Sequence, residues 1–278
     1  MLWRGRRQSS NVEDRRFSGK GIAVGGGLVG IVIVIVNLLF GGDPSVVLDQ
    51  LQNTSQQQQL TPEEEAADNE RAEFVKVVLA ETEDVWHNLF KSSGKTYAEP
   101  TLVLYRNVVE SGCGNAGAAS GPFYCPADQK LYIDLSFYEE LQDRFKAPGD
   151  FAMAYVIAHE VGHHVQNLLG MTEKMDRLRQ QLSEKEYNTY SVKLELQADF
   201  YSGVWAYHTQ KMKNILETGD LDEAINAAQA VGDDRLQKES QGYVVPDAFT
   251  HGTSEQRAFW FKKGYQTGDI RQGDTFND

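Results

Sequence analysis

The residues most able to do chemistry in this sequence form one short cluster, His-Glu-Val-Gly-His, at positions 159–163. Apolar residues surround the cluster at helical spacing from Phe151 onward, which predicts that it lies within a helix. Residues four apart share one face of a helix, so the imidazoles of His159 and His163 can bind one Zn²⁺ ion. Glu160 then points toward the neighbouring open position. There it can take a proton from a zinc-activated water and pass it to a leaving amine.

A catalytic zinc site also needs a third protein ligand and one open position. The extended motif H-E-x-x-H-x-x-G-x-x-H is absent, because no histidine stands at position 169. We expect Glu195 to be the third ligand, since it lies 32 residues after His163 on a predicted helix and a helix–loop–helix return fits that separation. Asp199, one turn later, can accept a ring N–H from a ligand histidine and fix its tautomer. His208 and His251 are the alternative third ligands.

His251 is also a candidate catalytic residue beside Glu160. It stands just before a predicted helix over residues 254–264, where it can stabilise a tetrahedral oxyanion. Tyr190 and Tyr201 are alternatives for that role. The simpler interpretation is that His251 caps the local backbone and that Arg257 pairs with an acid.

The elements that must position these residues indicate an α+β domain over residues 61–278, with a small sheet before a helix-rich half. Thr61 and Glu64 suit a capping box at the first helix. Ser254 and Gly264 suit the cap and the stop of the last helix. The patterns predict helices over residues 61–91, 137–141, 150–169, 183–213, 221–231 and 254–264, and strands over residues 101–109 and 131–135.

A second feature is the apolar run GIAVGGGLVGIVIVIVNLLF at residues 21–40, which has 20 residues and no charge. A helix of that length measures about 30 Å, the thickness of a bilayer core, so we expect a transmembrane helix. A cleaved signal peptide is the alternative, but no small-x-small cleavage site follows. The expected domains are therefore a basic tail at residues 1–20, the span, a linker at residues 41–60 and the α+β domain behind it.

The charge distribution predicts orientation and excludes some partners. The 278 residues carry a net charge of −13, yet residues 1–42 hold six basic and two acidic side chains. Basic residues before a span favour the cytoplasm, so we expect a single-pass membrane protein with a cytoplasmic N-terminus and a periplasmic or extracellular domain. The acidic remainder argues against nucleic acid as a partner, because phosphate binding needs a basic face. The sequence carries no signal of its oligomeric state.

Motifs along nearly the whole chain resemble the bacterial putative neutral zinc metallopeptidase family. They are the basic N-terminus with its span, Cys113…Cys125, LYID at 131–134, HEVGHHVQ at 159–166, ELQAD at 195–199 and HGTSEQR at 251–257. The resemblance implies a zincin-like fold and a membrane-anchored peptidase. The E-x-x-A-D element is similar to that of gluzincins, whose third ligand is the Glu. The His251 segment departs from the wider gluzincin pattern, so the resemblance leaves its role open.

Two smaller signals concern the region before the zinc helix. Cys113 and Cys125 flank a Gly-rich loop, and outside the cytoplasm they can form a disulfide worth about 3 kcal/mol. Two free thiols or soft zinc ligands are the alternatives. In zincins a sheet edge strand holds the peptide substrate by β-augmentation, and residues 124–134 are the candidate here because they precede the zinc helix.

The sequence therefore predicts a membrane-anchored zinc metallopeptidase that hydrolyses peptide bonds in a peptide or protein substrate, with a zinc-activated water and Glu160 as general base. Two alternatives belong to other classes. One is a zinc-containing peptide-binding or scaffolding protein with little turnover. The other is a structural zinc site, which would take a fourth protein ligand such as His208 or His251.

Overall fold

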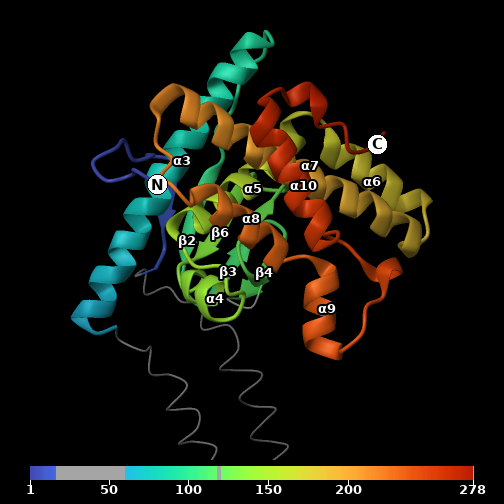
Figure 1. Ribbon diagram of the computed structural model, residues 1–278, viewed down its shortest axis with the longest axis horizontal. Helices are drawn as coiled ribbons and strands as arrows, with labels where there is room; N and C mark the ends of the chain where they lie inside the picture. The colour runs from blue at the N-terminus through green and yellow to red at the C-terminus, as the bar shows by residue number, and fades with distance from the viewer. Residues whose placement is uncertain (17–59, 118–119, 278) are drawn as a thin grey trace, which may run out of the picture. The chain divides into compact units, whose positions relative to one another are not determined.

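The computed structural model describes residues 1–16, 60–117 and 120–277 (Figure 1). The predicted transmembrane helix at residues 21–40 lies outside the described residues. Within the described part of the chain, every helix is too short or too polar to cross a bilayer. The chain divides into two compact units, one made of Met1–Arg16 with Arg71–Asp278 and the other of Phe17–Glu70.

The predicted α+β class is confirmed. The strands are β1 (Val12–Asp14), β2 (Thr101–Tyr105), β3 (Val108–Ser111), β4 (Gly114–Gly117), β5 (Phe123–Cys125) and β6 (Lys130–Asp134). The helices are α3 (Pro62–Ser92), α4 (Phe137–Asp143), α5 (Asp150–Leu168), α6 (Met171–Gln181), α7 (Glu184–Lys213), α8 (Asp220–Ala230), α9 (Asp233–Gln241) and α10 (Ser254–Thr267), with short 3-10 turns η2 (Pro246–Ala248) and η3 (Ile270–Gln272).

The main sheet has the order β1-β2-β6-β5, in which β5 alone runs antiparallel to its neighbour. Central strand β2 is buried on both faces: Leu102 and Leu104 face the main core, and Val103 and Tyr105 face a smaller cluster. A parallel strand that is covered on both faces has an almost continuous apolar sequence, so the position of β2 could be predicted. The sheet thus offers β5 as an edge beside the zinc helix.

Two predicted strands are divided in the structure. The strand expected over residues 101–109 ends at Tyr105, because Asn107 has a φ of 66° and turns the chain into the separate hairpin β3–β4. The substrate strand expected over residues 124–134 is a pair, β5 and β6. Strand β6 is bonded to β2 on one side and β5 on the other, so of this pair only β5 can offer a free edge to a substrate.

The N-terminal segment differs from the predicted separate tail at residues 1–20. Residues 1–16 belong to the same compact unit as the helices and the sheet. Strand β1 pairs in parallel with β2, and the ring of Trp3 packs edge-on against that of Phe74 on α3, with centroids 5.4 Å apart. The prediction considered only the charges of this segment and not its buried Met1 and Trp3.

Helices α5 and α7 carry most of the candidate site residues, and α10 packs against α7 (Figure 1). A Cβ atom on Gly203 would lie 2.1 Å from the Phe261 carbonyl oxygen, and one on Gly264 would lie 2.1 Å from the Phe200 carbonyl oxygen. The predicted stop at Gly264 is therefore wrong, because this glycine lies inside α10, at its crossing with α7. The N-cap is also one residue earlier than predicted, at Thr253.

Capping boxes also begin α3 and α7, and the one on α3 was predicted. Thr61 and Glu64 form reciprocal hydrogen bonds at the start of α3, as expected. Ser183 caps α7 in the same way. Helices α6 and α9 were missed, because both are short and polar and bury only one residue each, Met175 and Asp233. Such helices lack the apolar stripe on which a sequence-based prediction depends.

The close crossing of α7 and α10 generates a stability prediction with an unusual sign. A Gly→Ala change inside a helix normally stabilises it by up to about 1 kcal/mol. Gly264→Ala should instead lower the free energy of unfolding by about 1–3 kcal/mol, because the new methyl group overlaps the backbone of α7. Urea denaturation of the full-length protein, followed by circular dichroism, measures this free energy. Lys262→Ala, at an exposed position of α10, should change the free energy of unfolding by less than about 0.5 kcal/mol. A Gly264→Ala protein as stable as the parent would contradict the packing.

Candidate metal centre

A cavity of about 620 Å³ opens between the edge strand β5 and helix α5, the helix that carries the H-E-x-x-H motif and is called the zinc helix below. Its walls include Tyr124 of β5, Glu160 of α5 and Glu195 of α7. His159 and His163 lie on the same wall, as the H-E-x-x-H spacing predicts. The cavity also reaches His251 and Arg257, which come from the C-terminal part of the chain.

Three ligand atoms converge in this cavity. The Nε2 atom of His159 lies 3.1 Å from one carboxylate oxygen of Glu195, and the Nε2 atom of His163 lies 3.4 Å from the other. The two Nε2 atoms are 3.2 Å apart. Donors about 2.0–2.1 Å from a tetrahedral zinc ion would stand roughly 3.3 Å from one another. The three side chains therefore already have the spacing that zinc requires.

The alternative ligands lie elsewhere. Among the described residues, neither His208 nor His251 joins this cluster. The ring of His208 donates instead to the carbonyl oxygen of Gly268, at 2.8 Å. The two cysteines are joined to each other and are not available to a metal.

Each ligand histidine is oriented by a partner on its other ring nitrogen. The Nδ1 atom of His159 lies 2.8 Å from Asp199, in the role predicted for that aspartate. The Nδ1 atom of His163 lies 2.8 Å from the side-chain oxygen of Gln166, whose amide group donates to the Leu194 carbonyl. Donation from both Nδ1 atoms leaves both Nε2 atoms free for the metal. Sequence reasoning missed Gln166, although an amide three residues after a ligand on the same helix face is a usable signal.

Asp199 is fully buried and connects three helices. It accepts hydrogen bonds from the Tyr155 hydroxyl at 2.5 Å and from Nε and Nη2 of Arg257 at 2.8 and 3.0 Å. Burial alone would raise the pKa of Asp199, but Arg257 and His159 hold it below its usual value. Arg257 is itself buried, so its positive charge is matched to this carboxylate. The acidic partner predicted for Arg257 is therefore Asp199, whereas Tyr155 was not predicted as part of the site.

The same carboxylate governs the proton on His159. Burial alone would lower the pKa of His159, but Asp199 outweighs it and raises the pKa to about 10, while Arg257 acts in the opposite direction. Zinc binds the neutral imidazole, so metal binding releases this proton. Arg257 makes the replacement of this proton by zinc easier, because its positive charge neutralises Asp199.

Glu160 lies against the edge strand. Its carboxylate is buried and lines the cavity together with Tyr124, and burial raises its pKa above the ordinary value. The Tyr124 hydroxyl is held in turn by the Asn167 amide and the His164 ring, each at 3.1 Å. Burial lowers the pKa of His164, so this ring is a neutral structural link between β5 and α5.

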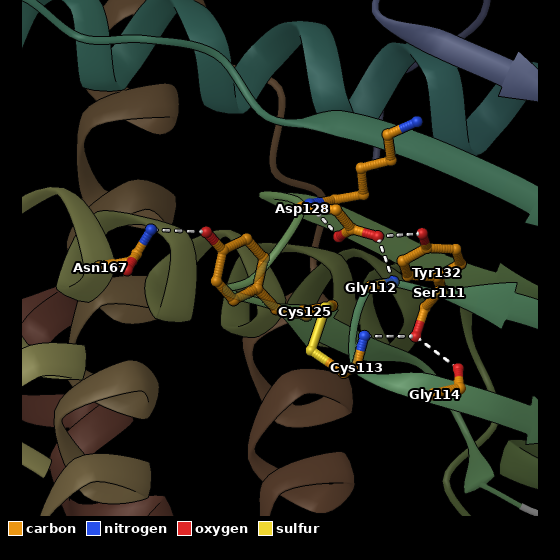
Figure 2. The surroundings of a disulfide bond; sticks show 10 residues. Ser111, Gly112, Cys113, Gly114, Cys125, Asp128, Tyr132 and Asn167 are labelled. Carbon is orange, nitrogen blue, oxygen red and sulfur yellow. Dashed lines mark hydrogen bonds between the residues drawn. A yellow bond between two sulfur atoms is a disulfide. The ribbon is translucent and has the colours of Figure 1, made fainter. Parts of the chain in front are cut away.

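The predicted disulfide between Cys113 and Cys125 is confirmed and holds the other end of β5 (Figure 2). It joins the end of β5 to the turn of the β3–β4 hairpin. Figure 2 also shows Asp128, which accepts hydrogen bonds from the Gly112 backbone N–H at 2.7 Å and the Tyr132 hydroxyl at 2.6 Å. The edge strand is therefore fixed both to the hairpin and to the zinc helix.

His251 reaches the cavity from the loop before α10. Its side chain is 49% exposed, and its Nδ1 atom lies 3.2 Å from Asp233. The hydrogen bond that His251 donates to the Asp233 carboxylate raises the pKa of His251. The alternative oxyanion donors do not line the cavity: Tyr201 is buried in the core, and Tyr190 packs against the ring of Phe276.

A second cluster of carboxylates lies outside this cavity, beside the amino group of Met1. Carboxylates of Asp150, Asp220 and Glu223 also lie within ligand distance of one another. The amino group of Met1 stands 2.8 Å from Asp150 and 3.3 Å from Asp220.

Comparison with known proteins agrees with the geometry. The family model described as putative neutral zinc metallopeptidase matches residues 1–276. The chain belongs to this family. Uncharacterized protein YpfJ of Escherichia coli strain K12 is 51% identical over 289 residues, which cover 99% of each chain. Uncharacterized protein Mb2605 of Mycobacterium bovis is 42% identical over 191 residues, which cover 65% of this chain and 64% of that protein. No solved structure matches the chain.

For this member of the zinc metallopeptidase family, the buried arginine generates a prediction about metal affinity. Arg257→Gln should weaken zinc binding by about 10–100-fold, because Asp199 loses the charge that neutralises it and holds His159 protonated more firmly. Competition with a chelating dye on the full-length protein measures the affinity. Arg271→Gln removes an exposed arginine and should leave the affinity unchanged. Equal zinc affinity in Arg257→Gln and the parent would show that the guanidinium plays no part in the site.

Proposed function

We propose that this protein is a zinc-dependent peptidase that hydrolyses peptide bonds, with Glu160 as its general base. The supporting observation is that ligand atoms of His159, His163 and Glu195 converge within 4.8 Å in the same cavity that holds the Glu160 carboxylate. Zinc bound there supplies Lewis-acid chemistry, which lowers the pKa of water and polarises a carbonyl group.

The edge strand supports an extended peptide as the substrate. No described strand pairs with the free edge of β5, and residues 120–124 line the cavity. A peptide added to this edge as a further strand would exchange backbone hydrogen bonds with β5. Because Tyr124 and Glu160 line the same cavity, a peptide bond aligned on β5 would pass beside the catalytic carboxylate.

The remaining steps use groups of the chain itself. Glu160 takes a proton from the attacking water and passes it to the leaving amine, and its raised pKa makes it a stronger base for the first transfer. His251, held by Asp233, donates a hydrogen bond to the oxyanion. Asp199 and Gln166 keep the two ligand imidazoles in place during the reaction.

The structure favours this proposal over the two alternative functions. A structural zinc site would take a fourth protein ligand, and neither His208 nor His251 stands in the ligand cluster. A peptide-binding protein without turnover has no use for a buried carboxylate beside the ligands, since burying Glu160 costs free energy. Residues 21–40 remain the proposed membrane anchor, which would direct the activity to peptides or proteins near a membrane surface.

The role of Glu160 gives the most direct functional prediction. Glu160→Gln keeps the shape of the side chain but removes the base, so the kcat/KM for peptide hydrolysis should fall by about 10²–10⁴-fold while zinc content stays the same. Metal analysis together with cleavage of casein or a peptide library tests both parts. Glu184→Gln, at an exposed position of α7, is the matched control and should retain full activity. Undiminished cleavage by Glu160→Gln would rule out the proposed base.

The pKa of His251 predicts the alkaline limb of the activity profile. Asp233 raises this pKa, so the imidazolium is present at lower pH and is lost as the pH rises through the raised value. His251→Ala should lower kcat by about 10²–10³-fold, retain zinc and abolish that limb. Asp233→Asn should move the limb to lower pH. Measurement of kcat against pH distinguishes these results, and an unaltered profile in His251→Ala would assign His251 to backbone capping alone.

A further inference from the structure

The N-terminal segment is an integral part of the catalytic unit. Residues 1–16 belong to the same compact unit as residues 71–278, although the apolar run at residues 21–40 separates them in the sequence. This arrangement bears on membrane topology, because a segment that crosses a bilayer once leaves its two flanks on opposite sides.

The first set of contacts is made by the backbone. Strand β1 pairs with β2 in the register Val12↔Leu102 to Asp14↔Leu104. Further hydrogen bonds extend the ladder at both ends: the Leu102 N–H donates to Asn11 at 2.9 Å, and the Arg15 N–H donates to Leu104 at 2.8 Å. Strand β1 thus covers an edge of the central sheet that would otherwise expose unpaired backbone groups.

The second set neutralises a buried acid. Glu83 on α3 is 3% exposed, and it accepts hydrogen bonds from Arg7 at 2.9 Å, from Asn11 at 2.9 Å and from the Ser9 hydroxyl. All three donors belong to the N-terminal segment. A buried carboxylate that lost these donors would be strongly destabilising, so α3 requires the segment for its own packing.

These contacts also weaken the basic residues of the segment as evidence for membrane topology. Arg6 and Arg7 form ion pairs with Glu81 and Glu83 of α3, and Arg16 pairs with Asp14. Charges that are paired within a folded domain are a weak topology signal, because the positive-inside rule concerns basic residues in short loops beside a span. Their number therefore does not require a cytoplasmic tail apart from the domain.

We propose that residues 1–16 and the catalytic domain lie on the same side of the membrane. Hydrogen bonds of 2.8–2.9 Å between β1 and β2 cannot form across an apolar layer of about 30 Å. This proposal replaces the single-pass arrangement expected from the sequence. The cleft and the N-terminus would then face the same set of proteins.

Thiol labelling of the full-length protein in bacterial spheroplasts tests the proposal. Ser10→Cys and Ser240→Cys place single new thiols at exposed positions of the N-terminal segment and of α9. Each variant reacts with a membrane-impermeant maleimide before and after permeabilisation, and the parent chain reports the background. We expect both positions to behave alike, either labelled in intact spheroplasts or protected until permeabilisation. Labelling of one position with protection of the other would overturn the proposal.

Cross-linking in native membranes provides a second measurement. Glu13 and Lys130 form an ion pair at 2.5 Å between β1 and β6. The double variant Glu13→Cys with Lys130→Cys should be joined within one chain by a short bis-maleimide, while the two single variants should not. Absence of the cross-link in protein whose two thiols both react with a simple maleimide would show that the segment does not pack on the domain in the membrane.

Discussion

The site depends on one buried carboxylate. Asp199 receives hydrogen bonds from His159 and Tyr155 on α5 and from Arg257 on α10, while it belongs to α7 itself. An anion at this depth is tolerated only because its lone pairs are occupied and its charge is matched by the guanidinium. The same contacts aim the His159 ring at Glu195, so the requirement to satisfy one carboxylate also sets the geometry of the metal ligands.

The rest of the structure brings these groups within reach of one another. Gly203 and Gly264 let α7 and α10 approach closely enough for Arg257 to meet Asp199. Asn167 and His164 hold the Tyr124 hydroxyl, so the edge strand lies against the zinc helix. The disulfide fixes the far end of that strand to a hairpin. Cavity, base and ligands are thus positioned by rigid elements rather than by a loop.

Local features of the site could be predicted from the sequence. His159, Glu160 and His163 lie within one helical turn, so their common face follows from helix geometry alone. Glu195 and Asp199 could be predicted because they lie among apolar residues, where a buried carboxylate is costly unless it binds a metal or a hydrogen-bond donor. The cysteine pair could be predicted from its spacing and the absence of other cysteines, and the structure confirms it.

Features that depend on contacts distant in sequence could not be predicted. Arg257 is 58 residues from Asp199, and no local pattern connects them. Gly264 resembled a helix stop because the sequence does not show which helix crosses it. The arginines of the N-terminal segment resembled a topology signal because their partners lie on α3, about 75 residues away. In each case the deciding interaction is a tertiary contact.

The central claim is that His159, His163 and Glu195 hold zinc and leave one position open. X-ray absorption at the zinc edge of the loaded full-length protein tests this most directly. The account predicts nitrogen and oxygen neighbours at about 2.0–2.2 Å, two of them from imidazole, and no sulfur. Glu195→Ala should remove one oxygen neighbour or the metal itself. A third imidazole, a sulfur neighbour or a spectrum unchanged in Glu195→Ala would contradict the account.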